Sequence, residues 1–385
     1  MNTEPAADQA HRPPSAKPFL FSAYLLIFII HDAQIGVGLP GFQRIIYRSA
    51  GHDAWISVIL AGLYVHLLAW IIVMTLHRAG DRDLYGIHDA VYGKWLGRCL
   101  NLLVVFYYLY ACIVVLRNYV EMVQIWLFPY SDAWMLGLIF ASLAVYGIHG
   151  GLKTIVGASF VFVCLSVWMV ILLYFPLVYA DWDHLFPVAE ADPQHLMLGA
   201  VRMSFSLVGF EILYYLYPFV RDKQKVHKYA QLGIMSVNVF YFLVMAVSLV
   251  FFSGGQIFKN AWATFTMLKI IQIPFLERFE YLGVSLWLMV IMGNLLLFGW
   301  TATRGLKQVF QWKQKYAVVV FFAVVWLVST RIETRVQMDK INDLFATLSL
   351  YTVYLYPLFL FGLVLLRMKS KDGKEETSDE AETVK

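Results

Sequence analysis

The stretch HDAQIGVGLPGF, residues 31–42, contains the spelling G-x-G-x-x-G at residues 36–41. In a soluble α/β protein this spelling follows a strand, opens a helix and binds a dinucleotide, with an acidic ribose partner about twenty residues further on. Here it lies deep in an apolar segment, and no acidic residue follows at that distance. The pattern therefore does not predict a nucleotide site, and we expect no cofactor. Two interpretations remain, namely close helix packing through small residues and a helix broken by Gly36, Gly38, Pro40 and Gly41.

The overall composition is that of a membrane protein. Of the 385 residues, 60% are hydrophobic and only 15% are charged, and the mean hydropathy is +0.64. A soluble domain has roughly 45–50% apolar and about 25% charged residues. Apolar runs long enough to cross a bilayer recur from Phe19 to Leu366, each of them near the required length of about 20 residues. The sequence thus predicts an all-α polytopic protein embedded in a lipid bilayer.

Charges and cysteines exclude two other kinds of protein. The net charge of +4 is not gathered into a basic stripe with interleaved aromatic residues, so we expect no nucleic acid partner. Cys99, Cys112 and Cys164 fall in or beside apolar runs, and no C-x-x-C is present. They are expected to be small buried side chains rather than a disulfide framework or a metal site.

Ten membrane-spanning helices are predicted, at about 19–46, 54–77, 99–128, 132–149, 154–180, 196–219, 230–254, 279–303, 315–330 and 342–367. Residues 1–18 precede this domain as a polar N-terminal segment, and residues 368–385 follow it as a charged tail. The termini and the loops on their side carry 20 lysines and arginines, whereas the alternate loops carry 8. Because positive loops stay in the cytoplasm, both termini are expected to be cytoplasmic.

A second interrupted helix favours the broken-helix interpretation of the first. The sequence SFSLVGFEILYYLYP, residues 204–218, places Gly209 and Glu211 near the centre of the sixth span. A carboxylate at that depth costs about 2.5–3.5 kcal/mol on insertion scales, so it should face a partner or a cavity. The breaks fall in spans 1 and 6, which are matching positions in two five-helix halves, 19–180 and 196–367. Such a pair is typical of inverted repeats with a binding site at the midplane.

With these features the chain resembles the B subunits of spore germinant receptors, which are permeases of the amino acid–polyamine–organocation superfamily. The resemblance covers about residues 19–367 and rests on the order and spacing of several short segments: IGVG (35–38), DAWISVILAG (53–62), GKWLG (93–97), Arg117 with Glu121, GG (150–151), FPV (186–188), VGFE (208–211), FLERFE (275–280) and FGWTATRGLKQVF (298–310). It implies a five-plus-five inverted repeat in the spore inner membrane. It also implies a nutrient sensor, for an amino acid or a similar small molecule, working with an A-type membrane subunit and a C-type lipoprotein subunit.

The resemblance also implies a ligand site. The broken first helix would offer backbone amides to a ligand carboxylate at Gly36, Val37 and Gly38, and the broken sixth helix would contribute Val208, Gly209, Phe210 and Glu211. Pocket positions in spans 3 and 8 correspond to Tyr107, Asn294 and Phe298. Two departures stand out. The glycine motif continues as LPGFQR, where the family usually has a Leu-Pro-Arg ending. Gly293 and Asn294 occupy positions where hydroxyl residues hold sodium in sodium-coupled relatives, so sodium coupling is not expected.

Other polar residues in the spans have alternative roles. Glu211 is expected to bind a ligand amine, relay a proton or pair with a buried partner, with no preference among the three. His31 and Asp32 are adjacent, so only one of them is expected to face a cavity. Arg117 and Glu121, four residues apart, are expected to form an ion pair near the outer end of span 3, which fixes that helix or, as the alternative, takes part in gating. Residues 255–278 are too polar to span the bilayer, and they are predicted to form either an amphipathic helix over the outer face or a surface helix without a site role.

The residues do not favour an enzyme, because H-E-x-x-H, P-loop and intramembrane Ser-His-Asp patterns are all lacking. The function expected is a nutrient-binding subunit of a germinant receptor. The alternatives are an amino acid transporter of the same fold and a structural membrane partner with an empty site.

Overall fold

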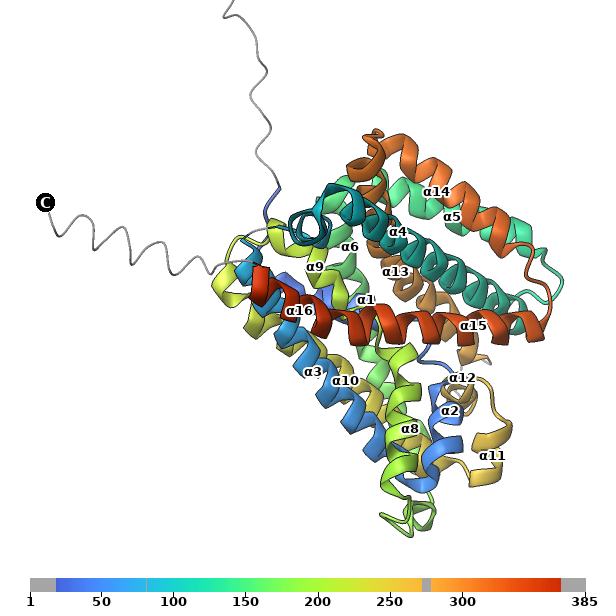
Figure 1. The fold of residues 1–385 in the computed structure, drawn as a ribbon. Helices are drawn as coiled ribbons and strands as arrows, with labels where there is room; N and C mark the ends of the chain where they lie inside the picture. The colour runs from blue at the N-terminus through green and yellow to red at the C-terminus, as the bar shows by residue number, and fades with distance from the viewer. Residues whose placement is uncertain (1–18, 81, 272–277, 368–385) are drawn as a thin grey trace, which may run out of the picture.

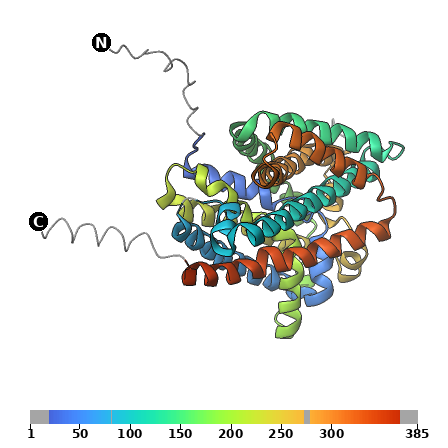
Figure 2. The same cartoon turned by 45° about the horizontal axis from the view of Figure 1, so that its top comes forward.

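The computed structural model describes residues 19–80, 82–271 and 278–367. The predicted N-terminal segment and charged tail lie outside these residues. The described chain is helical, and its one backbone bridge between extended residues joins Phe21 to Val220. That bridge ties the segment before the first span to the segment after the sixth. Figure 1 and Figure 2 show the blue beginning and the red end of the described chain at the same end of the molecule.

The first half of the chain contains the helices η1 (Ala23–Leu25), α1 (Leu26–Gln34), α2 (Phe42–Ala50), α3 (Ala54–Ala79), α4 (Leu84–Trp126), α5 (Ala133–His149), α6 (Gly151–Ser166), η3 (Val167–Leu173) and α7 (Tyr174–Val178). Local chemistry explains several of their ends. Asp83 caps α4 by accepting a hydrogen bond from the amide of Gly86 at 3.0 Å. Gly80, at φ +63°, ends α3 in the left-handed region that favours glycine.

The second half contains α8 (Pro193–Met203), η5 (Ser204–Leu207), η6 (Phe210–Ile212), α9 (Leu213–Leu216), η7 (Tyr217–Phe219), α10 (Val226–Phe251), α11 (Gly254–Lys259), α12 (Ala263–Leu268), α13 (Phe279–Phe310), α14 (Gln314–Ser329), α15 (Arg335–Ser349), the π-helical turn η9 (Leu350–Leu355) and α16 (Tyr356–Arg367). The helix α15 starts with a capping box, in which Thr334 accepts from the Gln337 amide and the Gln337 side chain accepts from the Thr334 amide.

Helix length and composition support a membrane-embedded protein. Within the described residues, six helices are long and apolar enough to cross a bilayer, and a bent pair, Pro193–Leu207 with Phe210–Phe219, makes a seventh at a bend of 52°. Three shorter apolar helices, Ala23–Gln34, Ala133–His149 and Gln314–Ser329, lie at the predicted spans 1, 4 and 9. The all-helical fold and the breaks in spans 1 and 6 are confirmed, and the number ten remains a prediction.

Several predicted boundaries were wrong. The helix α4 begins at Leu84 rather than near 99, and it includes a kink at Gly93, where φ is +81°. The prediction left residues 84–98 out of the span because the charged side chains among them are typical of a loop. The last span likewise begins at Arg335 rather than near 342. In place of one amphipathic helix, the described part of 255–278 forms the two short helices α11 and α12.

The centre of the molecule is built around α13, which packs along α4 and against α1, α5, α6 and α14 (Figure 1). Glycines on α13 permit these close contacts. A Cβ at Gly293 would lie 2.0 Å from the Asp32 carboxylate, and one at Gly299 would lie 2.7 Å from the Phe322 ring. The helix α10 packs on α1 and α3 from the other side. Both broken helices are therefore held inside the bundle rather than at its surface.

Candidate functional site

The break in the first span leaves a set of backbone groups outside any helix. The helix α1 ends at Gln34 and α2 begins at Phe42. On the carbonyl side, Asn294 Nδ2 donates to the oxygens of Asp32 at 2.6 Å and Ile35 at 3.1 Å. Within the described residues, no acceptor is hydrogen-bonded to the amides of Gly36, Val37 or Gly38. The carbonyl side of this break is thus satisfied by α13, while the amide side is open to a ligand or water.

The downstream part of the same break is held by α12. Thr264 Oγ1 donates to the Leu39 oxygen at 3.0 Å, and the Thr264 amide donates to the Pro40 oxygen at 3.2 Å. Gln43 Nε2 in turn donates to Thr264 Oγ1 at 2.7 Å. The segment 255–278, which was predicted to lie at the surface, therefore contributes hydrogen bonds that hold the unwound backbone.

The second break lies at Gly209, whose φ of +125° is a conformation that L side chains rarely adopt. A Cβ at this position would lie 2.2 Å from the Ala33 oxygen, so the two breaks touch through their backbones. The Gly209 amide donates to Glu211 Oε2 at 2.7 Å, whereas the buried Glu211 Oε1 has no hydrogen-bond partner. Gln34 Nε2 also donates to the Leu207 oxygen at 2.7 Å, which links the end of α1 to the sixth span.

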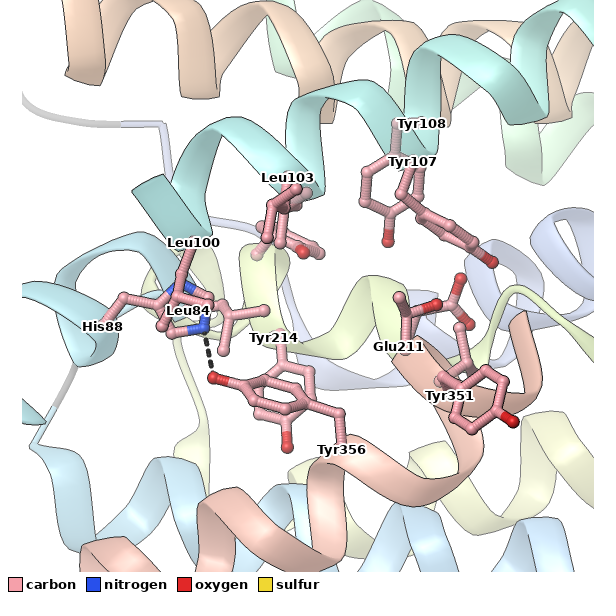
Figure 3. Close-up of a pocket in the computed structure, with 14 residues that line it drawn as sticks. Leu84, His88, Leu100, Leu103, Tyr107, Tyr108, Glu211, Tyr214, Tyr351 and Tyr356 are labelled. Carbon is pink, nitrogen blue, oxygen red and sulfur yellow. Dashed lines mark hydrogen bonds between the residues drawn. The ribbon is translucent and has the colours of Figure 1, made fainter. Parts of the chain in front are cut away.

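Two cavities flank the region where the breaks meet. The first, which we call the tyrosine cavity, has a volume of about 270 Å³. Glu211 projects into it from the broken sixth span, and α4 supplies Tyr107 and Tyr108 (Figure 3). The full lining is Leu84, His88, Leu100, Leu103, Val104, Tyr107, Tyr108, Glu211, Tyr214, Tyr215, Tyr351, Thr352, Val353 and Tyr356. Aromatic and aliphatic side chains dominate this wall.

The second cavity, which we call the polar cavity, has a volume of about 430 Å³. Its lining includes the unwound residues Val37 and Gly38 together with Gly41, Arg44, Ile45, Arg48, Asn118, Arg202, Phe205, Ala261, Trp262, Arg335, Asp339, Asn342, Asp343 and Ala346. Four arginines outnumber two aspartates, so the cavity favours an anionic group. Arg335 is engaged by Glu121 at 2.9 Å and by Asp339 at 3.2 Å, whereas the buried Nε of Arg44 has no hydrogen-bond partner.

An aromatic partition separates the two cavities, which share no lining residue. Phe345 on α15 stacks on Tyr107 with ring centroids 5.6 Å apart and meets Phe205 edge-on at 5.8 Å. Tyr107 lines the tyrosine cavity and Phe205 lines the polar cavity. Because Phe345 is buried, its ring fills the space between them.

The predicted site residues therefore divide into three groups. Val37 and Gly38 line the polar cavity, and Tyr107 and Glu211 line the tyrosine cavity. The others, which line neither cavity, are Gly36, Val208, Gly209, Phe210, Asn294 and Phe298. Asn294 braces the first break, and Phe298 packs on Tyr108 at 5.5 Å between centroids. The structure thus brings the predicted residues to one region without placing them in one pocket.

Two predictions about polar pairs were wrong. His31 and Asp32 of α1 both line one small cavity of about 20 Å³. Residues of the neighbouring α6 and α10 line the same cavity, so it contacts both side chains. Arg117 does not pair with Glu121. Its Nε donates to the Ile332 oxygen at 2.6 Å, and Glu121 binds Arg335 instead.

Sequence reasoning also missed residues that line the cavities. Arg44 and Arg48 were treated only as loop charges, although their spacing of four residues places them on one face of α2. Sequence reasoning assigned no site role to Tyr108 and Tyr214, although both line the tyrosine cavity. Nothing in their local sequence distinguishes them from other tyrosines of the spans.

The two touching breaks and the helix packing define a membrane protein with the fold of known transporters. Solved structures support this assignment. The chain is similar to MhsT in complex with L-phenylalanine, at a TM-score of 0.60 and 12% identity, covering 91% of this chain and 89% of that one. It is also similar to Mhp1, a nucleobase-cation-symport-1 family transporter, at a TM-score of 0.58 and 14% identity, covering 86% and 77% of the two chains.

Sequence comparisons give the family. Residues 21–338 match the family described as Spore germination protein. Spore germination protein GerQB of Bacillus cereus is 34% identical over 335 residues, which is 87% of this chain and 93% of that protein. Spore germination protein B2 of Bacillus subtilis (strain 168) is 24% identical and covers 90% and 96% of the two chains. The chain belongs to the spore germination permease family, and it is not an enzyme.

Proposed function

We propose that the protein is the nutrient-binding membrane subunit of a spore germinant receptor, and that its ligand is an amino acid or a similar small anion-bearing nutrient. The observation that carries this proposal is the polar cavity, whose wall contains the unwound residues Val37 and Gly38. Their amides have no acceptor within the described residues, and free amides of a broken helix bind carboxylates. Family membership supports the germination role.

The charges of the polar cavity suit a zwitterion. Arg44, with its unpartnered buried Nε, and the neighbouring Arg48 attract a carboxylate. Asp343 lines the same cavity and supplies an acceptor for an ammonium group. The proposed complex lies in the spore inner membrane with both termini in the cytoplasm. Ligand binding would favour one arrangement of the bundle over another, and A-type and C-type partner subunits would receive that change.

The first test is a screen of the purified chain against free amino acids, nucleosides and sugars, read as ligand-dependent thermal stabilisation. A ligand at 100 times its dissociation constant adds about 2.7 kcal/mol to the free energy of unfolding. Arg44→Gln should remove the stabilisation by a carboxylate ligand. The matched control is Arg331→Gln, because Arg331 is exposed and lines neither cavity. Equal binding by both variants would contradict the assignment of the ligand to the polar cavity.

A transporter of the same fold is the second candidate, favoured by the similarity to solved transporter structures. Uptake separates the two. A transporter should accumulate the labelled ligand in liposomes containing this chain alone, whereas a receptor subunit should bind the ligand without sustained uptake. Sustained accumulation that Arg44→Gln abolishes would replace the receptor proposal with the transporter.

A further inference from the structure

The tyrosine cavity contains a cluster of polar atoms that the proposed carboxylate site does not use. Two buried oxygens that face each other on its wall, Glu211 Oε1 and the Tyr108 hydroxyl, have no hydrogen-bond partner within 3.5 Å among the described residues (Figure 3). Buried polar atoms without partners are uncommon in folded proteins, because each one loses its hydrogen bonds to water without gaining others. Two such atoms beside one space of about 270 Å³ indicate a site for a polar group brought from outside.

The charge of the cavity defines that group. No lysine or arginine is among the described residues that line it. His88 is not a counter-ion for Glu211, because both of its ring nitrogens are engaged. His88 Nδ1 pairs with Asn101 Oδ1 at 2.8 Å, and Nε2 pairs with the Tyr356 hydroxyl at 2.8 Å (Figure 3). The second contact fits a neutral ring that accepts from the tyrosine. Among the described residues of this wall Glu211 is therefore the one carboxylate, and the complementary ligand group is a cation.

The remaining wall selects an apolar body for that cation. Rings of Tyr107, Tyr108 and Tyr351 lie around the carboxylate (Figure 3), and tyrosine faces attract ammonium groups within about 6 Å. The volume lies just below the roughly 300 Å³ at which pockets begin to hold drug-sized ligands, so a small molecule fits. A free carboxylate on the ligand would find no cation here.

The opening of the cavity points to a route through the bilayer. Leu103 of α4 is 63% exposed, and Tyr351 of the π-helical turn η9 is 61% exposed. Both belong to apolar spans, so their exposed faces lie toward lipid rather than water. The π-helical turn, an uncommon conformation that often marks functional sites, supplies Tyr351, Thr352 and Val353 to the wall. A molecule that dissolves in lipid can therefore reach Glu211 from the side.

We propose that the tyrosine cavity is a second binding site, which takes a small apolar amine and holds its ammonium group on Glu211 beside the hydroxyl of Tyr108. This site is distinct from the polar cavity in its residues and in its ligand, which lacks a carboxylate. It stands whether or not the polar cavity binds a nutrient.

The test uses the full chain in phosphatidylcholine nanodiscs and labelled 2-phenylethylamine, with empty nanodiscs giving the background. The expected result is saturable binding that falls at least tenfold in Glu211→Gln. The matched control is Glu280→Gln, since Glu211 and Glu280 are both 5% exposed and Glu280 lies outside the cavity. That control and Arg44→Gln should bind the amine as the unaltered chain does.

A neutral molecule of the same shape as the amine shows whether a loss of amine binding comes from the lost charge or from misfolding. 2-Phenylethanol should bind Glu211→Gln and the unaltered chain equally, which shows that the variant keeps its cavity. Tyr108→Phe removes one hydroxyl with little change of shape. It should weaken the binding of 2-phenylethylamine more than the binding of 2-phenylethanol. The proposal is overturned if no saturable amine binding occurs, if Glu211→Gln binds the amine undiminished, or if Arg44→Gln abolishes it.

Discussion

The brace between Asn294 and the first break gives the sharpest test of how the broken helix is held. Asn294 Nδ2 donates to the Asp32 oxygen at 2.6 Å and to the Ile35 oxygen at 3.1 Å. Asn294→Asp keeps the size and shape of the side chain but replaces the donor with an oxygen. The two carbonyls, which lie outside the normal helix ladder, would then face an acceptor in a buried setting.

The magnitude follows from these two bonds. A buried carbonyl left unpaired costs about 1–3 kcal/mol, so the loss is about 2–6 kcal/mol in the free energy of unfolding. Tm changes by about 2–4 °C per kcal/mol in chains of 150–250 residues and by less in a longer chain. At about 1–2 °C per kcal/mol for a chain of this length, a fall of roughly 2–12 °C in the apparent Tm is expected for the detergent-purified protein.

Asn260→Asp is the matched control for this substitution. Asn260 Oδ1 accepts from the Trp262 amide and from the Thr266 hydroxyl, both at 3.1 Å. Aspartate keeps both acceptors, so the apparent Tm should change by less than about 2 °C. The reasoning is refuted if both variants lose the same stability, or if Asn294→Asp unfolds at the temperature of the unaltered chain. In either case the donor of Asn294 would not be what holds the break.

Two further substitutions test the second break and the cap of α4. Gly209→Ala places a Cβ 2.2 Å from the Ala33 oxygen at φ +125°. We therefore expect this variant to give much less folded protein, measured by size-exclusion chromatography. Gly255→Ala is the control, because a Cβ there has no atom within 4 Å and should leave the yield unchanged. Asp83→Asn should cost about 1.5–3 kcal/mol and lower the Tm, because Asp83 Oδ2 accepts two bonds from Arg304 at 2.9 and 3.0 Å. Asp83→Ala, which also loses the cap, should lower the Tm further, and equal values for the two variants would contradict the capping role.

The broken helices could be predicted from sequence because their causes are local. Glycine and proline weaken a helix through their own backbone chemistry, so Gly36, Gly38 and Pro40 mark the first break without reference to the rest of the chain. Glu211 beside Gly209 marks the second, since a carboxylate inside an apolar span requires a partner or a cavity. Length and apolar composition predict most of the spans by the same kind of local argument.

The arrangement of the site could not be predicted in this way. Asn294 reaches α1 across 262 positions in the sequence, and only the packing of α13 decides that its amide braces the break instead of lining a pocket. Phe345 separates the two cavities because α15 lies between Tyr107 and Phe205. Which polar atoms remain unpartnered depends likewise on every neighbour within about 3.5 Å. The sequence by itself determined a bundle of membrane helices with two breaks, because those features depend on adjacent residues. The tertiary structure decided which residues share a cavity, because that depends on long-range packing.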